Sequence, residues 1–170
     1  KLSASGKRVV AVSEFFPQDK LLQDSTYQGQ FDPHVWMDPE LWLLIIDGIH
    51  KRLADFDQPG RAYYSANAER LKLGLHDLAA YATKVLSSVP EEARILVTAH
   101  DAFNYFGRRF GYTVLGIQGL STESEAGVQD LEKIVGVLVE KKVKAVFVES
   151  TVSERNDQAL IEGAKARGHQ

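Results

Sequence analysis

In the middle of the chain, two consecutive runs of hydrophobic positions repeat with the spacing of an α-helix. The first run follows Asp38-Pro39-Glu40, in which Asp38 can cap a helix, Pro39 suits its first position and Glu40 suits the positive end of its dipole. The apolar residues that follow predict a helix over 39–54. A second run, over 61–88, advances by alternating steps of four and three residues. Its apolar positions are Tyr64, Ala68, Leu71, Leu75, Leu78, Ala82 and Val85.

The second helix would be about 40 Å long. A seam held over three heptads is typical of a coiled-coil partner, and it also suits a strut packed along one domain or between two lobes.

Shorter apolar runs predict strands on both sides of these helices. The β-branched run Val9–Ser13 predicts a strand, whereas residues 16–38 show no period. After Pro90 strands and helices alternate. The predicted strands are 94–99, 112–117 and 145–148, and the predicted helices are 102–110, 122–140 and 156–167. Fully apolar strands between helices predict a parallel sheet that is covered on both faces.

Capping signals accompany the predicted helices of this second part. Asp101 can cap the first helix, residues 122–125 have a capping-box sequence, and Gly168 suits the end of the last helix. The fold class is therefore α/β, and we interpret the chain as a fragment of a larger two-lobed protein. Residues 1–60 would be the C-terminal part of the first lobe, 61–89 the connecting helix, and 90–170 a second α/β lobe truncated before its last strand.

Composition and charge exclude several classes of function. The 170 residues contain 20 Lys and Arg against 23 Asp and Glu, a net charge of −3, which argues against sequence-independent nucleic-acid binding. No apolar run approaches the roughly 18–20 residues that span a bilayer. Because the chain has no Cys, it can form neither a disulfide nor a thiolate metal site.

Two of the five histidines lie where a ligand could bind. His34 lies between two Asp-Pro steps that stiffen its loop, with Trp36 available to shield it. His100 ends a predicted parallel strand, at the edge where open α/β sheets bind ligands, although it could simply hydrogen-bond within the turn. Glu149 ends the third predicted strand at the same edge and could be a ligand, a hydrogen-bond acceptor behind a ligand or a general base.

The remaining histidines, His50, His76 and His169, are expected to have surface or structural roles. No two histidines have the i, i+4 spacing of a zinc protease helix. The chain also lacks a Gly-x-Ser-x-Gly elbow and the glycine-rich phosphate motifs. Two imidazoles with carboxylates and no thiolate suit a divalent cation such as zinc or manganese.

Four segments together resemble the zinc and manganese solute-binding proteins of ABC importers, the TroA-like family. They are DPHVWMDP (32–39), VTAHDAFNYF (97–106), QGLSTESEA (118–126) and VFVES (146–150). The resemblance implies two α/β lobes joined by a long helix, with one metal ion between them. It implies that His34 and His100 are metal ligands, and that Glu149 lies near the cleft without binding the ion.

The family site also uses a histidine upstream of residue 1 and an aspartate downstream of residue 170. We therefore expect an incomplete site, weak metal binding by this chain alone, and a dimer driven by truncation. The resemblance implies a receptor, periplasmic or lipid-anchored on the outer face of the cytoplasmic membrane, that delivers a dication to an ABC importer permease. Zinc is slightly preferred over manganese, and cell adhesion is an associated property. The alternative is a metal-dependent hydrolase that uses His34, His100 and Glu149; Asp101 is a further cleft residue to consider.

Overall fold

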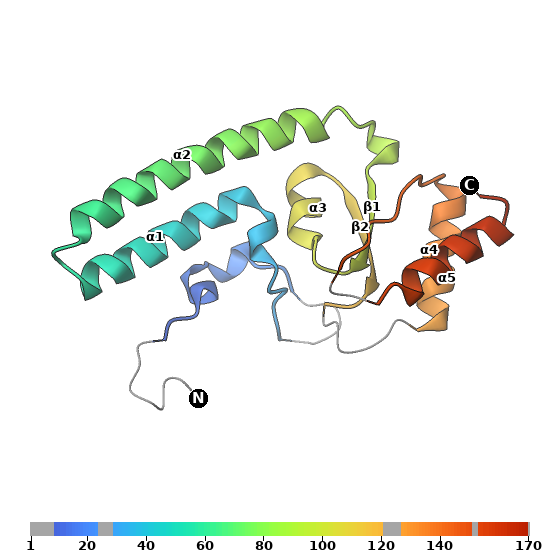
Figure 1. The fold of residues 1–170 in the computed structure, drawn as a ribbon, viewed down its shortest axis with the longest axis horizontal. Helices are drawn as coiled ribbons and strands as arrows, with labels where there is room; N and C mark the ends of the chain where they lie inside the picture. The colour runs from blue at the N-terminus through green and yellow to red at the C-terminus, as the bar shows by residue number, and fades with distance from the viewer. Residues whose placement is uncertain (1–8, 24–28, 121–126, 151–152, 170) are drawn as a thin grey trace.

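The N-terminal part of the computed structural model is built on a hairpin of two helices. The structure describes residues 9–23, 29–120, 127–150 and 153–169. Helices α1 (Pro39–Phe56) and α2 (Arg61–Leu86) lie side by side (Figure 1). Asp38 caps α1 as predicted, because its Oδ1 accepts a hydrogen bond from the backbone N–H of Glu40 at 2.9 Å. Short 3₁₀ turns precede α1, at Val12–Phe15, Gln18–Lys20 and Val35–Met37.

The face that α2 presents to the protein matches the predicted heptad seam only in part. Leu71, Leu78 and Val85, three of the seven seam positions, are exposed. The other four, Tyr64, Ala68, Leu75 and Ala82, are buried or half-buried, and so are Ser65, Asn67, Lys72, Ala79 and Leu86 outside the seam. A straight helix rotates a seven-residue pattern by about 20° per heptad, so a strict seam cannot stay against one neighbour. In this chain α2 packs along α1, as a strut would.

The C-terminal part is an α/β unit with a parallel sheet, as predicted. Strand β1 (Ile95–His100) pairs in parallel with β2 (Thr113–Gln118), from Ile95 opposite Thr113 to His100 opposite Gln118. Helix α3 (Asn104–Phe110) lies on one side of this sheet, and α4 (Val128–Glu140) and α5 (Arg155–Ala166) lie on the other (Figure 1). A 3₁₀ turn, Glu91–Ala93, leads from α2 into β1. The core between sheet and helices contains Val97, Ile117, Ile134, Val135, Leu138, Leu160 and Ala164.

Two predicted strands were wrong. Residues 9–11 have no regular structure and Val12–Phe15 is a 3₁₀ turn, so Val9–Ser13 is not a strand. Residues 145–148 make only one parallel bridge, between Phe147 and Thr98, and Phe147 and Val148 are exposed. A strand forms where its backbone N–H and C=O groups pair with a neighbouring strand. Among the described residues, no strand lies beside 9–13, and Phe147 has a partner on one side only, in β1.

The capping predictions for the C-terminal part had mixed outcomes. Asp101 does not cap α3, because the helix begins at Asn104 and its N-cap position is Phe103, two residues after Asp101, which makes no side-chain cap hydrogen bond. The capping box at 122–125 lies outside the described residues, and α4 begins after Gly127. Gly168 follows α5 with a φ of +79°, the left-handed geometry expected after a helix end.

Helix α3 joins the two parts of the molecule. The fully buried Tyr105 packs with Phe16, Val35, Leu41 and Ile45 of the N-terminal part. Nearby, Arg108 donates to the carbonyl of Lys20 at 2.9 Å and Arg109 forms an ion pair with Glu40. These contacts hold the loop before α1 against the end of β1 that carries His100.

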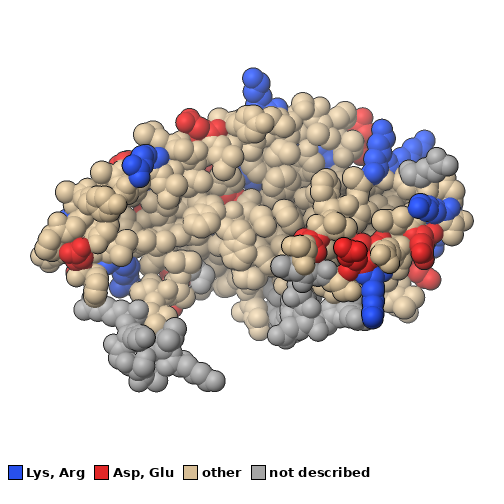
Figure 2. Space-filling model, in the orientation of Figure 1, with Lys and Arg blue, Asp and Glu red and all other residues tan. Residues whose placement is uncertain are grey.

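On the face shown in Figure 2, charged side chains of both signs gather over the C-terminal part, and others are scattered over the helical hairpin. Among the described helices, none is both long and apolar enough to cross a membrane.

Candidate functional site

His34 is held by a carboxylate two residues before it. Oδ1 of Asp32 accepts hydrogen bonds from the backbone N–H of His34 and from its Nδ1, both at 2.8 Å. Pro33 between them makes this tight loop possible by fixing its own φ. Burial alone would raise the pKa of Asp32, but the hydrogen bonds from His34 and Asn104 outweigh it and hold the pKa below its usual value. An ionised carboxylate only accepts, so Nδ1 of His34 carries the proton.

His100 has the same arrangement with a different carboxylate. Its Nδ1 lies 2.7 Å from Oε1 of Glu149, which follows the bridge at Phe147. The sequence predicted that these two residues share the carboxyl edge of a parallel sheet, and the structure brings them into contact there. Both side chains are partly shielded, with 16% of the His100 side chain and 25% of the Glu149 side chain exposed.

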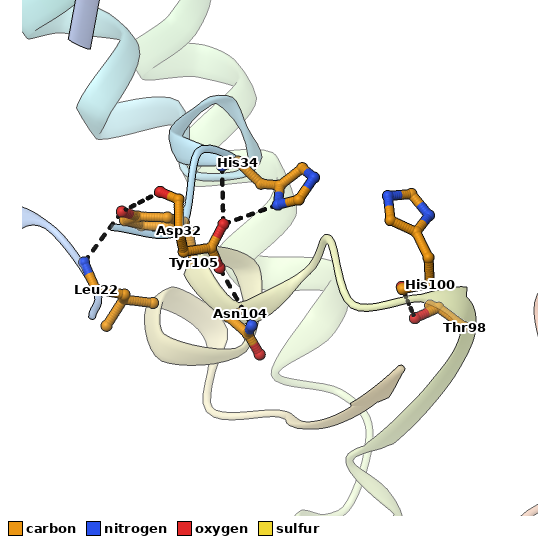
Figure 3. A network of polar contacts seen from close by, with 7 residues as sticks. All are labelled: Leu22, Asp32, His34, Thr98, His100, Asn104 and Tyr105. Carbon is orange, nitrogen blue, oxygen red and sulfur yellow. Dashed lines mark hydrogen bonds and ion pairs between the residues drawn. The ribbon is translucent and has the colours of Figure 1, made fainter. Parts of the chain in front are cut away.

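The two imidazoles face one another across a single gap (Figure 3). Their ring centroids are 5.5 Å apart at an interplanar angle of 63°. Both Nδ1 atoms are bonded to carboxylates, and neither Nε2 has a hydrogen-bond partner among the described residues. The gap is therefore lined by the two Nε2 atoms, and a neutral imidazole whose Nδ1 donates to a carboxylate presents a lone pair at Nε2. Within the described ranges, no group of three or more His, Asp or Glu residues is arranged to hold a metal ion.

Two other predicted site residues lie beside this gap. The Trp36 ring contacts His34 edge to face, with centroids 5.3 Å apart, but 47% of Trp36 is exposed, so it shields only one side of the imidazole. Asp101 directly follows His100, the last residue of β1. Its burial raises the pKa of its carboxyl group, and the charge of Asp32 adds to this, although the Asn104 hydrogen bond opposes it.

The residues that hold the Asp32 carboxylate and its backbone are not among those that the sequence indicates. Asn104 Nδ2 donates to Oδ2 of Asp32 at 3.1 Å, and the Tyr105 hydroxyl donates to the Asp32 carbonyl at 2.9 Å. The same hydroxyl accepts from the backbone N–H of Leu22 at 3.0 Å. Asn104 and Tyr105 lie in the quoted 97–106 segment, but nothing in a single sequence indicates a contact across more than 70 residues.

The other three histidines lie elsewhere. The ring of His50 hydrogen-bonds to the hydroxyl of Ser65 and thereby links α1 to α2. His169, which follows α5, hydrogen-bonds through its ring to the carbonyl of Val143. His76 is exposed on α2. None of them lines the gap between His34 and His100.

Comparison with known proteins identifies the family. The family model described as ZnuA, zinc-uptake complex component A, periplasmic, matches residues 1–169. This chain belongs to the ZnuA family. Its relatives include the manganese-binding lipoprotein MntA of Bacillus subtilis, 43% identical over 96% of this chain and 53% of MntA. The zinc-binding protein TroA of Treponema pallidum is 39% identical over 95% of this chain and 52% of TroA.

Solved structures of the family agree with the fold. The periplasmic zinc-binding protein TroA from Treponema pallidum matches with a TM-score of 0.91 and 36% identity, over 98% of this chain and 60% of TroA. A laminin-binding adhesin from Streptococcus agalactiae matches with a TM-score of 0.83 and 28% identity, over 96% of this chain and 60% of the adhesin. The α/β fold is therefore that of TroA-like metal-binding receptors. The chain spans about half the length of the curated relatives it matches.

Proposed function

We propose that this chain forms part of an extracytoplasmic solute-binding protein that captures a divalent transition metal for an ABC importer. The observation that carries the proposal is the pair of facing imidazoles, each with Nδ1 on a carboxylate and Nε2 toward the same gap. Zinc-bound histidines characteristically donate their other ring nitrogen to a carboxylate, which fixes the tautomer and raises the basicity of the ligand.

The separation of the rings also suits one shared ion. With Zn–N bonds of about 2.0–2.1 Å and a tetrahedral angle, two imidazoles on one zinc place their centroids about 5 Å apart. The observed 5.5 Å lies close to this value. His34 and His100 would then bind the ion through Nε2, while Glu149 would orient His100 without touching the metal.

Zinc is the preferred cargo in this proposal, although manganese is the runner-up. Two neutral nitrogen ligands suit zinc better than manganese, which favours oxygen ligands. One relative is named as a manganese-binding protein and another as a zinc-binding protein, so family membership alone leaves both metals open.

Two further ligands would come from parts of the parent receptor outside this chain. The described residues supply a pair of histidines, whereas zinc sites are usually four-coordinate. In the lobed organisation proposed here, a histidine of the first lobe and an aspartate of the second would complete the site. The 170-residue chain alone would then bind metal weakly.

The parent protein would act outside the cytoplasm, as a periplasmic or lipid-anchored receptor, and would deliver its ion to a membrane permease. Capture and release of an ion need no covalent step, so we propose no enzymatic activity. None of the relatives named above is a hydrolase by name, and no observation favours the hydrolase alternative. Adhesion would be an additional property, as in the streptococcal relative.

Replacement of each histidine tests this proposal in the full-length receptor. His34→Ala and His100→Ala should each weaken zinc affinity by orders of magnitude, because each leaves the ion under-coordinated. His50→Ala and His76→Ala are matched controls and should leave the affinity unchanged. Isothermal titration with zinc measures all four. Wild-type affinity in either test variant would remove that histidine from the site.

We also propose that the isolated 170-residue chain self-associates through the exposed face of α2. Leu71, Leu78 and Val85 are between 44% and 54% exposed and follow one another at seven-residue intervals on that face. Size-exclusion chromatography with light scattering should show a dimer of this chain and a monomer of the full-length receptor. A monomeric 170-residue chain would contradict the proposal.

A further inference from the structure

The carboxylate that orients His34 is itself held from a distant part of the chain. Asp32 is 2% exposed, and its Oδ1 is fully used by the two hydrogen bonds from His34. Among the described residues, its Oδ2 accepts one hydrogen bond, from the side-chain amide of Asn104 at 3.1 Å. No lysine or arginine forms an ion pair with Asp32 among the described residues. The orientation of this carboxylate therefore depends on Asn104.

Asn104 belongs to the side of the gap that carries His100. It is the first residue of α3, four residues after His100. Its amide group thus links the carboxylate behind His34 to the helix that follows His100. Figure 3 shows Asn104 below the Asp32 carboxylate, on the side away from the His34 ring. Tyr105, the next residue, holds the backbone carbonyl of Asp32.

We infer that Asn104 is a positioning residue for the metal site. By holding Oδ2 of Asp32, it fixes the plane of the carboxylate that orients His34, and so directs Nε2 of His34 toward His100. This inference rests on the proposed function, because it gives His34 the role of a ligand. It adds that the geometry of a ligand in the N-terminal part is set by a residue of the C-terminal part.

The test replaces Asn104 with a side chain of similar size that cannot donate. In the full-length receptor, Asn104→Leu should weaken zinc affinity by about 10-fold, the lower end of the loss seen when groups behind a ligand are removed. Asn67→Leu is the matched control, because Asn67 lies on α2 and its side chain accepts a hydrogen bond from Arg70, away from Asp32 and His34. Isothermal titration measures the affinity, and a thermal melt confirms that each variant is folded.

A second measurement reads His34 directly without metal. In ¹⁵N NMR of the zinc-free receptor, wild-type His34 should be mainly the Nδ1–H tautomer, and Asn104→Leu should shift it toward a mixture. Asn104→Ser, which retains a donor, should lie between the two. An unchanged His34 tautomer together with unchanged zinc affinity in Asn104→Leu would overturn the inference.

A double-variant cycle separates the route through Asp32 from any other route. If Asn104 acts through Asp32, then Asn104→Leu should cost little more affinity in an Asp32→Asn background. Additive losses would overturn the inference, because Asn104 would then act by a route other than Asp32. If His34→Ala itself leaves zinc affinity unchanged, the proposed function fails, whereas the tautomer measurement still reports whether Asn104 controls His34.

Discussion

Replacing Tyr105 with phenylalanine removes one oxygen atom from a side chain that has no exposed surface. The ring stays, so the apolar contacts of this residue with the N-terminal core are kept. The hydroxyl, however, donates to the carbonyl of Asp32 at 2.9 Å and accepts from the N–H of Leu22 at 3.0 Å. One missing oxygen therefore leaves two backbone groups without their partner.

The expected loss of stability follows from those two groups. A buried polar group left without a partner costs about 1–3 kcal/mol. The Asp32 carbonyl is buried and should lie toward the upper end, whereas the Leu22 N–H is only partly buried and water can reach it. Tyr105→Phe should therefore lower the free energy of unfolding by about 2–4 kcal/mol.

Urea unfolding followed by circular dichroism measures this change. Tyr112→Phe is the matched control, because its hydroxyl makes a single, partly buried hydrogen bond to the carbonyl of Leu86 at 3.1 Å. It should cost only about 0.5–1.5 kcal/mol. The slope of the urea dependence should be the same in both variants and the native protein. If Tyr105→Phe lowers the free energy of unfolding no more than Tyr112→Phe does, the two hydrogen bonds of the Tyr105 hydroxyl do not stabilise the contact between α3 and the N-terminal part.

Three further predictions concern other parts of the molecule. Asp157 is buried, and neither carboxylate oxygen has a hydrogen-bond partner among the residues that the structure describes; burial, with the charges of Glu154 and Glu149, raises its pKa. Its folded pKa exceeds the unfolded value, so stability should fall as pH rises from about 4 through the raised pKa. Asp157→Asn should thus be about as stable as the native protein at pH 3.5 and more stable at pH 7, and equal stability at pH 7 would refute this. A Cβ at Gly116 would lie 2.5 Å from the backbone of Asp101, so Gly116→Ala should cost about 1–3 kcal/mol in urea unfolding, whereas Gly136→Ala, with open space in α4, should gain about 0.5–1 kcal/mol. Zinc affinity of the full-length receptor should weaken as pH falls through about 6.5, because imidazole must be neutral to bind metal, and a constant affinity between about pH 5 and 8 would indicate a site made of carboxylates.

Local signals in the sequence determined most of the helices. The cap at Asp38 and the proline after it begin α1 in the structure as the sequence predicts, and the glycine at 168 follows α5. These features depend on residues within one or two turns of each other, so a sequence is enough to find them. The same applies to His100, because a polar residue at the end of an apolar parallel strand lies at the edge of the sheet.

Only the tertiary structure decided which apolar segments form strands, which face of α2 is buried, and how the side chains of the site are held in place. The apolar residues of Val9–Ser13 and 145–148 favour strands, but strand formation depends on ladder partners that the local sequence does not contain. The buried face of α2 is the one that packs against α1, and Leu71 lies outside it. The 5.5 Å between the imidazoles and the bond from Asn104 to the carboxylate behind His34 join residues about 70 apart in sequence. Such contacts arise from packing two parts of the molecule against each other, and no periodicity within either part encodes them.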